Sequence, residues 1–213
     1  MTRGTKSILF GVHQFMIHPV ILFIAWWQLY GFPWDPRLWV AFVVHDLGYW
    51  GCADMDGDEG EKHVYFGARV MSTLFSRRNR WMNKVWGCSF PEWYRKHDRW
   101  QSWWRFCVNH SRFMATQNNA PVSPLCVADK LVFVIEPWWL YLPRAWLSGE
   151  LAEYMAAARV KYAGSGILND SPMQWHRSTR EYLKQWVAAH KDGVEDTWTR
   201  QLGGTDRKEP ENE

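Results

Sequence analysis

The apolar residues of this chain recur at the spacing of an α-helix, and this periodicity constrains the fold more than any other feature. Between residues 60 and 75, the positions that follow one another at steps of three and four are His63, Phe66, Val70 and Leu74. Such positions share one face of a helix, so the histidine is expected on the buried side. No segment alternates convincingly between apolar and polar residues as a β-strand would. We therefore predict an all-α fold.

Prolines, glycines and capping residues divide the chain into successive helical segments. Helices are predicted over residues 8–30, 37–48, 60–75, 91–109, 148–162 and 171–191, and a further one begins at Ser123-Pro124. Gly31 and a proline-containing turn over residues 33–36 separate the first two segments. Ser171 opens the last segment with the spacing of a capping box.

A chain of 213 residues is long enough to bury a sizeable core in one domain. We predict that residues 1–202 form this domain, as a helical bundle with additional C-terminal helices. The polar tail over residues 203–213 is predicted to be disordered. The 17 tryptophans are expected mostly at contacts between helices, because an indole ring buries a large apolar area.

The sequence favours a cytoplasmic location and no contact with a membrane. Its longest apolar stretch, residues 19–27, is shorter than the roughly 20 residues that cross a bilayer. The N-terminal residues lack the cleavage signal of a secretory peptide. No Cys-x-x-Cys pair occurs among Cys52, Cys88, Cys107 and Cys126, which indicates reduced thiols rather than a structural zinc site.

Two adjacent side chains that can bind a metal, His45 and Asp46, follow an apolar run. Four further candidates lie in predicted helical segments near apolar neighbours: His18, His63, His110 and Asp129. Imidazole and carboxylate groups suit divalent transition metals such as Fe, Mn, Zn, Co or Ni. A lone histidine on an apolar helix face is more often a hydrogen-bonded core residue, but six such residues together favour metal binding.

His13 competes with His18 for the first position in this set. Five residues separate the two, which places them about 140° apart on one straight helix, too far to serve a single site. Leu22, Ala25 and Leu29 follow His18 at helical spacing and continue its face toward the core. We therefore choose His18 and keep His13 as the second candidate.

The order of these residues resembles that of the HD superfamily of metal-dependent phosphohydrolases, and the resemblance covers residues 13–136. It implies a single HD-type bundle in which a metal is held by His18, His45, Asp46 and Asp129. Members that bind two metals add histidines before the last aspartate, which implies roles for His63 and His110. Two segments look like their counterparts in the diadenosine-tetraphosphate hydrolase branch, namely His63–Ala68 and Ala128–Lys130.

The resemblance implies a binuclear centre bridged by Asp46 that hydrolyses a phosphoester or phosphoanhydride of a nucleotide-like substrate through metal-activated hydroxide. The same ligand order occurs in di-iron oxygenases, which stay an alternative. A nucleotide-binding sensor with a degenerate site is a third. Tyr49 stands where the branch often has lysine, which weakens the transfer of a substrate class. The sequence leaves open whether the chain forms a homo-oligomer.

Basic and aromatic side chains are concentrated in residues 77–112, which hold nine arginines and lysines, two acidic residues and six tryptophans. Such a mixture can bind phosphates and stack bases, although a solvated basic helix face is the plainer interpretation. Without a recognised nucleic-acid module, we expect a nucleotide-like small molecule and no stable nucleic-acid complex. The predicted substrate-binding residues are Arg112, Lys130 and Tyr49. The predicted catalytic residues are Asp46, Lys130 and Arg112.

An acidic segment over residues 54–61 lies between the His-Asp pair and His63. It is not a calcium-binding loop, because its sixth and twelfth positions are Glu59 and Tyr65 where such a loop needs glycine and glutamate. The segment is either a solvated loop or the source of a general acid, a histidine partner or an auxiliary ligand. The sequence does not choose among its carboxylates, of which the candidates are Asp54, Asp56 and Glu61.

Overall fold

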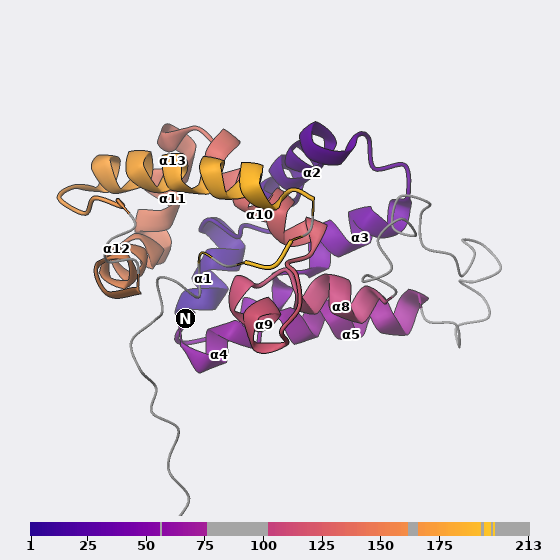
Figure 1. The fold of residues 1–213 in the computed structure, drawn as a ribbon. Coiled ribbons are helices and arrows are strands. Elements are labelled where there is room, and N and C mark those ends of the chain that lie inside the picture. The colour runs from indigo at the N-terminus through magenta and orange to yellow at the C-terminus, as the bar shows by residue number, and fades with distance from the viewer. Residues whose placement is uncertain (56, 76–101, 162–165, 193, 197, 199–213) are drawn as a thin grey trace, which may run out of the picture.

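A computed structural model describes residues 1–55, 57–75, 102–161, 166–192, 194–196 and 198 (Figure 1). Over these residues every regular element is a helix and no strand is present, which confirms the all-α prediction. The elements are α1 (Arg3–Phe10), α2 (Ile17–Tyr30), α3 (Pro36–Val44), the 3-10 helix η1 (Leu47–Tyr49), α4 (Asp58–Glu61), α5 (Val64–Phe75), α8 (Trp103–Val108), α9 (Arg112–Gln117), α10 (Pro124–Ile135), α11 (Trp138–Ser148), α12 (Glu150–Lys161) and α13 (Pro172–His190). The predicted tail over residues 203–213 lies outside the described residues.

Three helices begin as their local sequence predicts. The side chains of Asp35, Ser123 and Ser171 accept hydrogen bonds from backbone N–H groups in the first turns of α3, α10 and α13. Each of these caps is followed by a proline, whose missing N–H costs nothing in a first turn. At the other end of α2, Gly31 takes a positive φ of 84°, which ends that helix where expected.

The predicted helix over residues 8–30 is wrong in one respect, because the chain breaks between Phe10 and Ile17 to give α1 and α2. Within the break, the backbone N–H of Val12 donates to the Glu150 carboxylate from the distant helix α12, at 3.1 Å. A partner outside the helix therefore satisfies this amide. His13 lies in the break and not on the helix that carries His18, so the assumption of one straight helix does not hold.

The main core lies between helices α2, α3, α5, α8 and α10. Helix α5 runs beside α8, and α10 packs against α2 and α13 (Figure 1). The buried residues at these contacts include Leu22, Phe42, Met71, Phe106 and Leu125. The predicted metal ligands lie on or next to these same helices, so the packing of this core fixes their positions.

A second core joins α11, α12 and α13 to the break between α1 and α2. It contains Val12 from the break, Tyr141 from α11, Leu151 from α12 and Trp175 from α13. Helix α11 was not foreseen, because Pro143 lies inside it and proline is unfavourable in a helix interior. The three C-terminal helices thus pack onto the segment that carries His13.

Among the helices of the described part of the chain, none is both long and apolar enough to cross a bilayer. Three described cysteines, Cys52, Cys107 and Cys126, are free thiols and buried.

Candidate metal centre

Six side chains converge on the main core in two groups that share one residue. The first group consists of His18, His45, Asp46 and Asp129, and the second of Asp46, His63 and His110. Within each group, the nitrogen and oxygen atoms lie within 4.8 Å of one another. Asp129 is half-buried and the other five residues are buried, so the groups are enclosed by protein. Either group could hold a metal ion.

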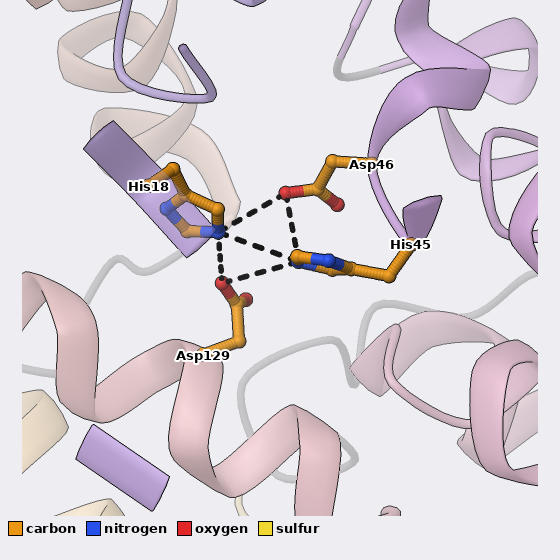
Figure 2. A group of neighbouring side chains, drawn as sticks. All are labelled: His18, His45, Asp46 and Asp129. Atoms are coloured by element: carbon orange, nitrogen blue, oxygen red, sulfur yellow. Dashed lines mark hydrogen bonds and ion pairs between the residues drawn. The ribbon is translucent and has the colours of Figure 1, made fainter. Parts of the chain in front are cut away.

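The first group brings its four side chains together from α2, from the end of α3 and from α10 (Figure 2). The Nε2 atom of His18 lies 3.2 Å from Oδ1 of Asp129 and 3.3 Å from Oδ2 of Asp46. The Nε2 atom of His45 lies 3.0 Å from the same Asp46 oxygen and 3.3 Å from Nε2 of His18. Figure 2 shows these four atoms facing a common point.

The second group lies on the other side of the Asp46 carboxylate. The Nε2 atoms of His63 and His110 are 3.0 Å apart. Oδ1 of Asp46 lies 3.3 Å from Nε2 of His110 and 3.6 Å from Nε2 of His63. Asp46 therefore turns Oδ2 toward the first group and Oδ1 toward the second.

Backbone carbonyl groups fix the orientation of three of the four histidines. The Nδ1 atom of His45 lies 3.0 Å from the Phe42 oxygen, and that of His63 lies 2.6 Å from the Gly60 oxygen. Nδ1 of His110 likewise contacts the oxygen of Cys107. A carbonyl oxygen only accepts hydrogen bonds, so each Nδ1 carries a proton and each ring turns its Nε2 edge to the site, where a neutral ring offers a lone pair.

When the rings of His63 and His110 are neutral, their Nε2 lone pairs have no donor to meet in the described part of the chain. Two neutral rings with protonated Nδ1 cannot form a hydrogen bond between their Nε2 atoms, although those of His63 and His110 are 3.0 Å apart. The buried Oδ2 atom of Asp46 has no partner with hydrogen-bond geometry among the described residues. A cation would satisfy these atoms together, and the mixture of imidazole and carboxylate suits a divalent transition metal.

The ionisation of the site also fits a cation. Burial opposes the charge on Asp46, but His45 and the other histidines outweigh it and hold the pKa of that carboxyl well below its usual range. For Asp129, burial is outweighed by Lys130 and the histidines, and its pKa is also well below normal.

Burial and the neighbouring His110 lower the pKa of His63 to about 3. Burial alone would lower the pKa of His45, yet Asp46 and Asp129 raise it to about 10. Without a metal, the negative charges of Asp46 and Asp129 therefore favour a proton on His45.

Two of the three residues predicted to bind substrate lie at the edge of this centre. The Lys130 ammonium group contacts Oδ2 of Asp129 at 2.8 Å, on the oxygen that does not face the histidines. The Tyr49 ring stacks on His63, with ring centroids 3.9 Å apart. Both side chains are half-buried, so they lie between the enclosed ligands and solvent.

Arg112, expected beside the metals, is held elsewhere. Its Nε donates to Asp196 at 2.6 Å, and its guanidinium group lies 4.7 Å from the ring centroid of Trp186. A terminal nitrogen of the guanidinium donates to Tyr182 at 3.1 Å. A buried guanidinium needs a carboxylate partner, and Asp196 supplies it from the C-terminal part of the chain. Arg112 is therefore committed to Asp196, Tyr182 and Trp186 in the described contacts, and its role in substrate binding and catalysis stays a prediction.

The acidic segment contributes support rather than a further ligand in the described residues. Glu61 accepts a hydrogen bond from Ser111, next to His110, at 2.8 Å. Glu59 binds backbone N–H groups of its own loop, and the Gly60 carbonyl orients His63. Asp56 lies outside the described residues, as does most of the basic segment over residues 77–112.

Sequence reasoning missed one residue near the centre and underrated another. The ring of His13 lies 5.7 Å from that of His18 and 5.0 Å from that of Tyr49, measured between centroids. Glu150 contacts His13 at 3.0 Å from helix α12. No local signal marks Glu150 in the sequence, since it is one of two glutamates at the start of its segment.

In comparisons with protein-family models, curated proteins and solved structures, nothing matches this chain.

Proposed function

We propose that this protein is a metal-dependent phosphohydrolase that holds two divalent transition metals and acts on a nucleotide-like substrate. The observation that carries the proposal is the sharing of Asp46 by two groups of ligands. A carboxylate that offers one oxygen to each of two cations is typical of two-metal hydrolytic sites. When bound, the metals would lower the pKa of coordinated water and neutralise charge on a phosphoryl group.

The proposal assigns a role to each ligand. His18, His45 and Asp129 would hold one metal together with Oδ2 of Asp46, and His63 and His110 would hold the other with Oδ1. The contacts from Nδ1 atoms to backbone carbonyls keep three of the rings in place and raise the basicity of their Nε2 atoms.

Two side chains at the edge of the site, Lys130 and Tyr49, favour an anionic substrate that carries an aromatic ring. Burial opposes the charge on Lys130, but Asp129 outweighs it and raises the pKa of the ammonium group. Lys130 therefore stays positive at neutral pH and half-exposed beside the ligands, where it could bind a phosphate oxygen. The half-exposed ring of Tyr49 offers an aromatic surface at the same edge.

Removal of the shared carboxylate tests the metal site. We expect Asp46→Asn to lose bound metal, measured by elemental analysis of the purified protein, together with any phosphohydrolase activity, while its circular dichroism stays that of a folded protein. Asp170→Asn is the matched control, because Asp170 is exposed and belongs to neither group of ligands. Asp46→Asn protein with full metal content and activity would contradict the proposal.

A substrate screen tests the reaction. Nucleotides, dinucleotides and cyclic nucleotides are incubated with metal-loaded protein, with and without oxygen, and release of phosphate or nucleotide is measured. We expect metal-dependent release that does not need oxygen. Oxygen-dependent turnover without cleavage of a phosphorus–oxygen bond would instead support a di-iron oxygenase. Nucleotide binding without turnover would support a sensor.

A further inference from the structure

His13, in the break between α1 and α2, is held by a buried network that is separate from the metal ligands. Its Nδ1 atom lies 2.8 Å from Oγ of Ser7 and 3.0 Å from Oε1 of Glu150. The Glu150 carboxylate is fully buried and also accepts hydrogen bonds from Ser7 at 2.7 Å, Tyr154 at 3.0 Å and the Val12 amide at 3.1 Å. Ser148 donates to it as well.

This network fixes which edge of the ring faces outward. Since Ser7 donates its hydroxyl proton to Glu150, the short contacts at Nδ1 of His13 require a proton on that nitrogen. The opposite nitrogen, Nε2, has no hydrogen-bond partner in the part of the chain that the structure describes. A buried carboxylate that orients an imidazole is a recurrent way to present the other nitrogen for chemistry.

The ring stands beside both groups of ligands without belonging to either. It is 5.7 Å from the ring of His18 in the first group, and 5.0 Å from Tyr49, which stacks on His63 in the second. His13 is half-buried while these histidine ligands are buried, so it lies on the open edge of the centre with Tyr49.

The C-terminal helices supply the groups that hold this segment. Glu150 comes from α12, and Arg144 of α11 donates to the Gly11 carbonyl at 3.0 Å. Glu136, at the end of α10, pairs with Arg144 and neutralises it. Glu150 and Arg144 thus fix the break on either side of Val12.

We propose that His13 is a catalytic residue that donates a proton to the leaving oxygen, and that Glu150 is its positioning residue. This inference rests on the proposed phosphohydrolase function. As the oxygen of water bonds to phosphorus, the bond to the leaving oxygen breaks and its electron pair stays on that oxygen. In the ring protonated on both nitrogens, the Nε2 proton passes to that oxygen. The proton that the attacking water gives up goes to solvent, and His13 then takes a proton back from solvent.

The activity test compares two leaving groups. An alkoxide such as a nucleoside hydroxyl needs a proton as it leaves, whereas p-nitrophenolate does not. In matched phosphomonoesters and phosphodiesters, we expect His13→Gln to lower kcat for the nucleoside esters by about 10²–10⁴-fold. The p-nitrophenyl esters should lose roughly tenfold or less, and metal content should stay at the wild-type value.

Glu150→Gln tests positioning. We expect it to reproduce the dependence on leaving group in a weaker form, with KM little changed. Glu153→Gln, one turn along the same helix, is the matched control, because Glu153 pairs with half-buried Arg3 and not with His13. The control should behave as wild type with both classes of ester.

A second measurement needs neither metal nor turnover. Long-range ¹H–¹⁵N correlation spectra of the histidine side chains report which ring nitrogen carries a proton, and His13→Gln identifies the signal. We expect a protonated Nδ1 in the wild type and a mixture of tautomers in Glu150→Gln. An unprotonated Nδ1 on His13 in the wild type would overturn the inference.

The remaining outcomes separate the two proposals. If the wild type cleaves the esters and His13→Gln matches it, or loses both leaving groups equally, the role of His13 is wrong and the proposed function stands. Loss of metal in His13→Gln would make His13 a ligand and also overturn the inference. If the wild type cleaves no ester in the presence of metal, the proposed function fails and the inference fails with it.

Discussion

At the scale of single residues, the contrast between Asp46 and Asp196 shows how a buried carboxylate is recognised by its surroundings. Asp46 faces four imidazole nitrogens, and its Oδ2 atom lacks a hydrogen-bond donor in the described structure. Asp196 binds the Arg112 guanidinium, the Trp186 indole and the Trp198 amide. Both oxygens of Asp196 accept hydrogen bonds from protein donors without a metal, whereas Oδ2 of Asp46 accepts none from the described residues. This contrast supports the proposal that Asp46 binds metal and that Asp196 stabilises the fold.

Removal of the Asp196 carboxylate should lower stability strongly. Asp196→Ala leaves the Arg112 charge buried without its main partner, and we expect a loss of about 3–5 kcal/mol in the free energy of unfolding, measured by urea denaturation. Adding Arg112→Met should recover part of this loss, because it removes the buried charge. Equal stability of the wild type and Asp196→Ala would show that the pair is not structural.

At the scale of elements, the close approach of α5 to the end of α3 sets the distance between the two groups of ligands. Gly67 of α5 lies against the end of α3, where an added Cβ atom would come within 2.9 Å of Cα of His45 and 3.0 Å of the Val44 oxygen. The adjoining element η1 lies even closer to the residue before α5, because a Cβ atom on Gly48 would come within 2.0 Å of the His63 backbone oxygen. Small residues at both positions let His45 and His63 share Asp46.

Gly67→Ala should therefore weaken metal binding, although alanine favours a helix over glycine by about 1 kcal/mol. We expect a lower thermal midpoint and a metal dissociation constant raised by roughly tenfold or more, measured by calorimetric titration, because a 1.4 kcal/mol change in binding is tenfold. Ser72→Ala on the same helix is the control, since it does not lie at this contact. Unchanged affinity in Gly67→Ala would mean that the helices adjust without moving the ligands.

At the scale of the whole molecule, the metal ligands come from segments that meet only when the main core is assembled. His18 and Asp129 lie on α2 and α10, while His63 and His110 flank α5 and α8. In the unfolded chain these residues are far apart, so a metal held by them would bind the folded state much better than the unfolded state. We therefore expect metal binding and global stability to be linked.

Metal should raise the thermal midpoint of the intact protein. At a free concentration about 100 times the dissociation constant, binding contributes about 2.7 kcal/mol, which corresponds to a rise of roughly 5–10 °C for a chain of this size. Scanning calorimetry with metal, and again after a chelator is added, measures the change. Asp46→Asn should show no comparable rise, and a wild type that is insensitive to both metal and chelator would refute the linkage.

The sequence by itself determined the helices that have strong local signals and the residues from which the site is built. Ser123 with Pro124 and Ser171 with Pro172 mark helix starts through backbone hydrogen bonds within four residues, and such signals can be read locally. The set of six candidate ligands was also readable, because histidines and aspartates that recur beside apolar positions are uncommon. Their order supplied the expectation of one shared aspartate.

Only the tertiary structure decided how these residues are used. The break at His13 depends on Glu150 and Arg144, which lie more than 130 positions away in the chain. The burial of Arg112 as an ion pair depends on Asp196, 84 positions away. Neither contact leaves a local pattern, because a carboxylate finds its buried partner through the packing of helices and not through spacing along the chain. The residue types fixed what chemistry is available, and the packing selected which atoms face one another.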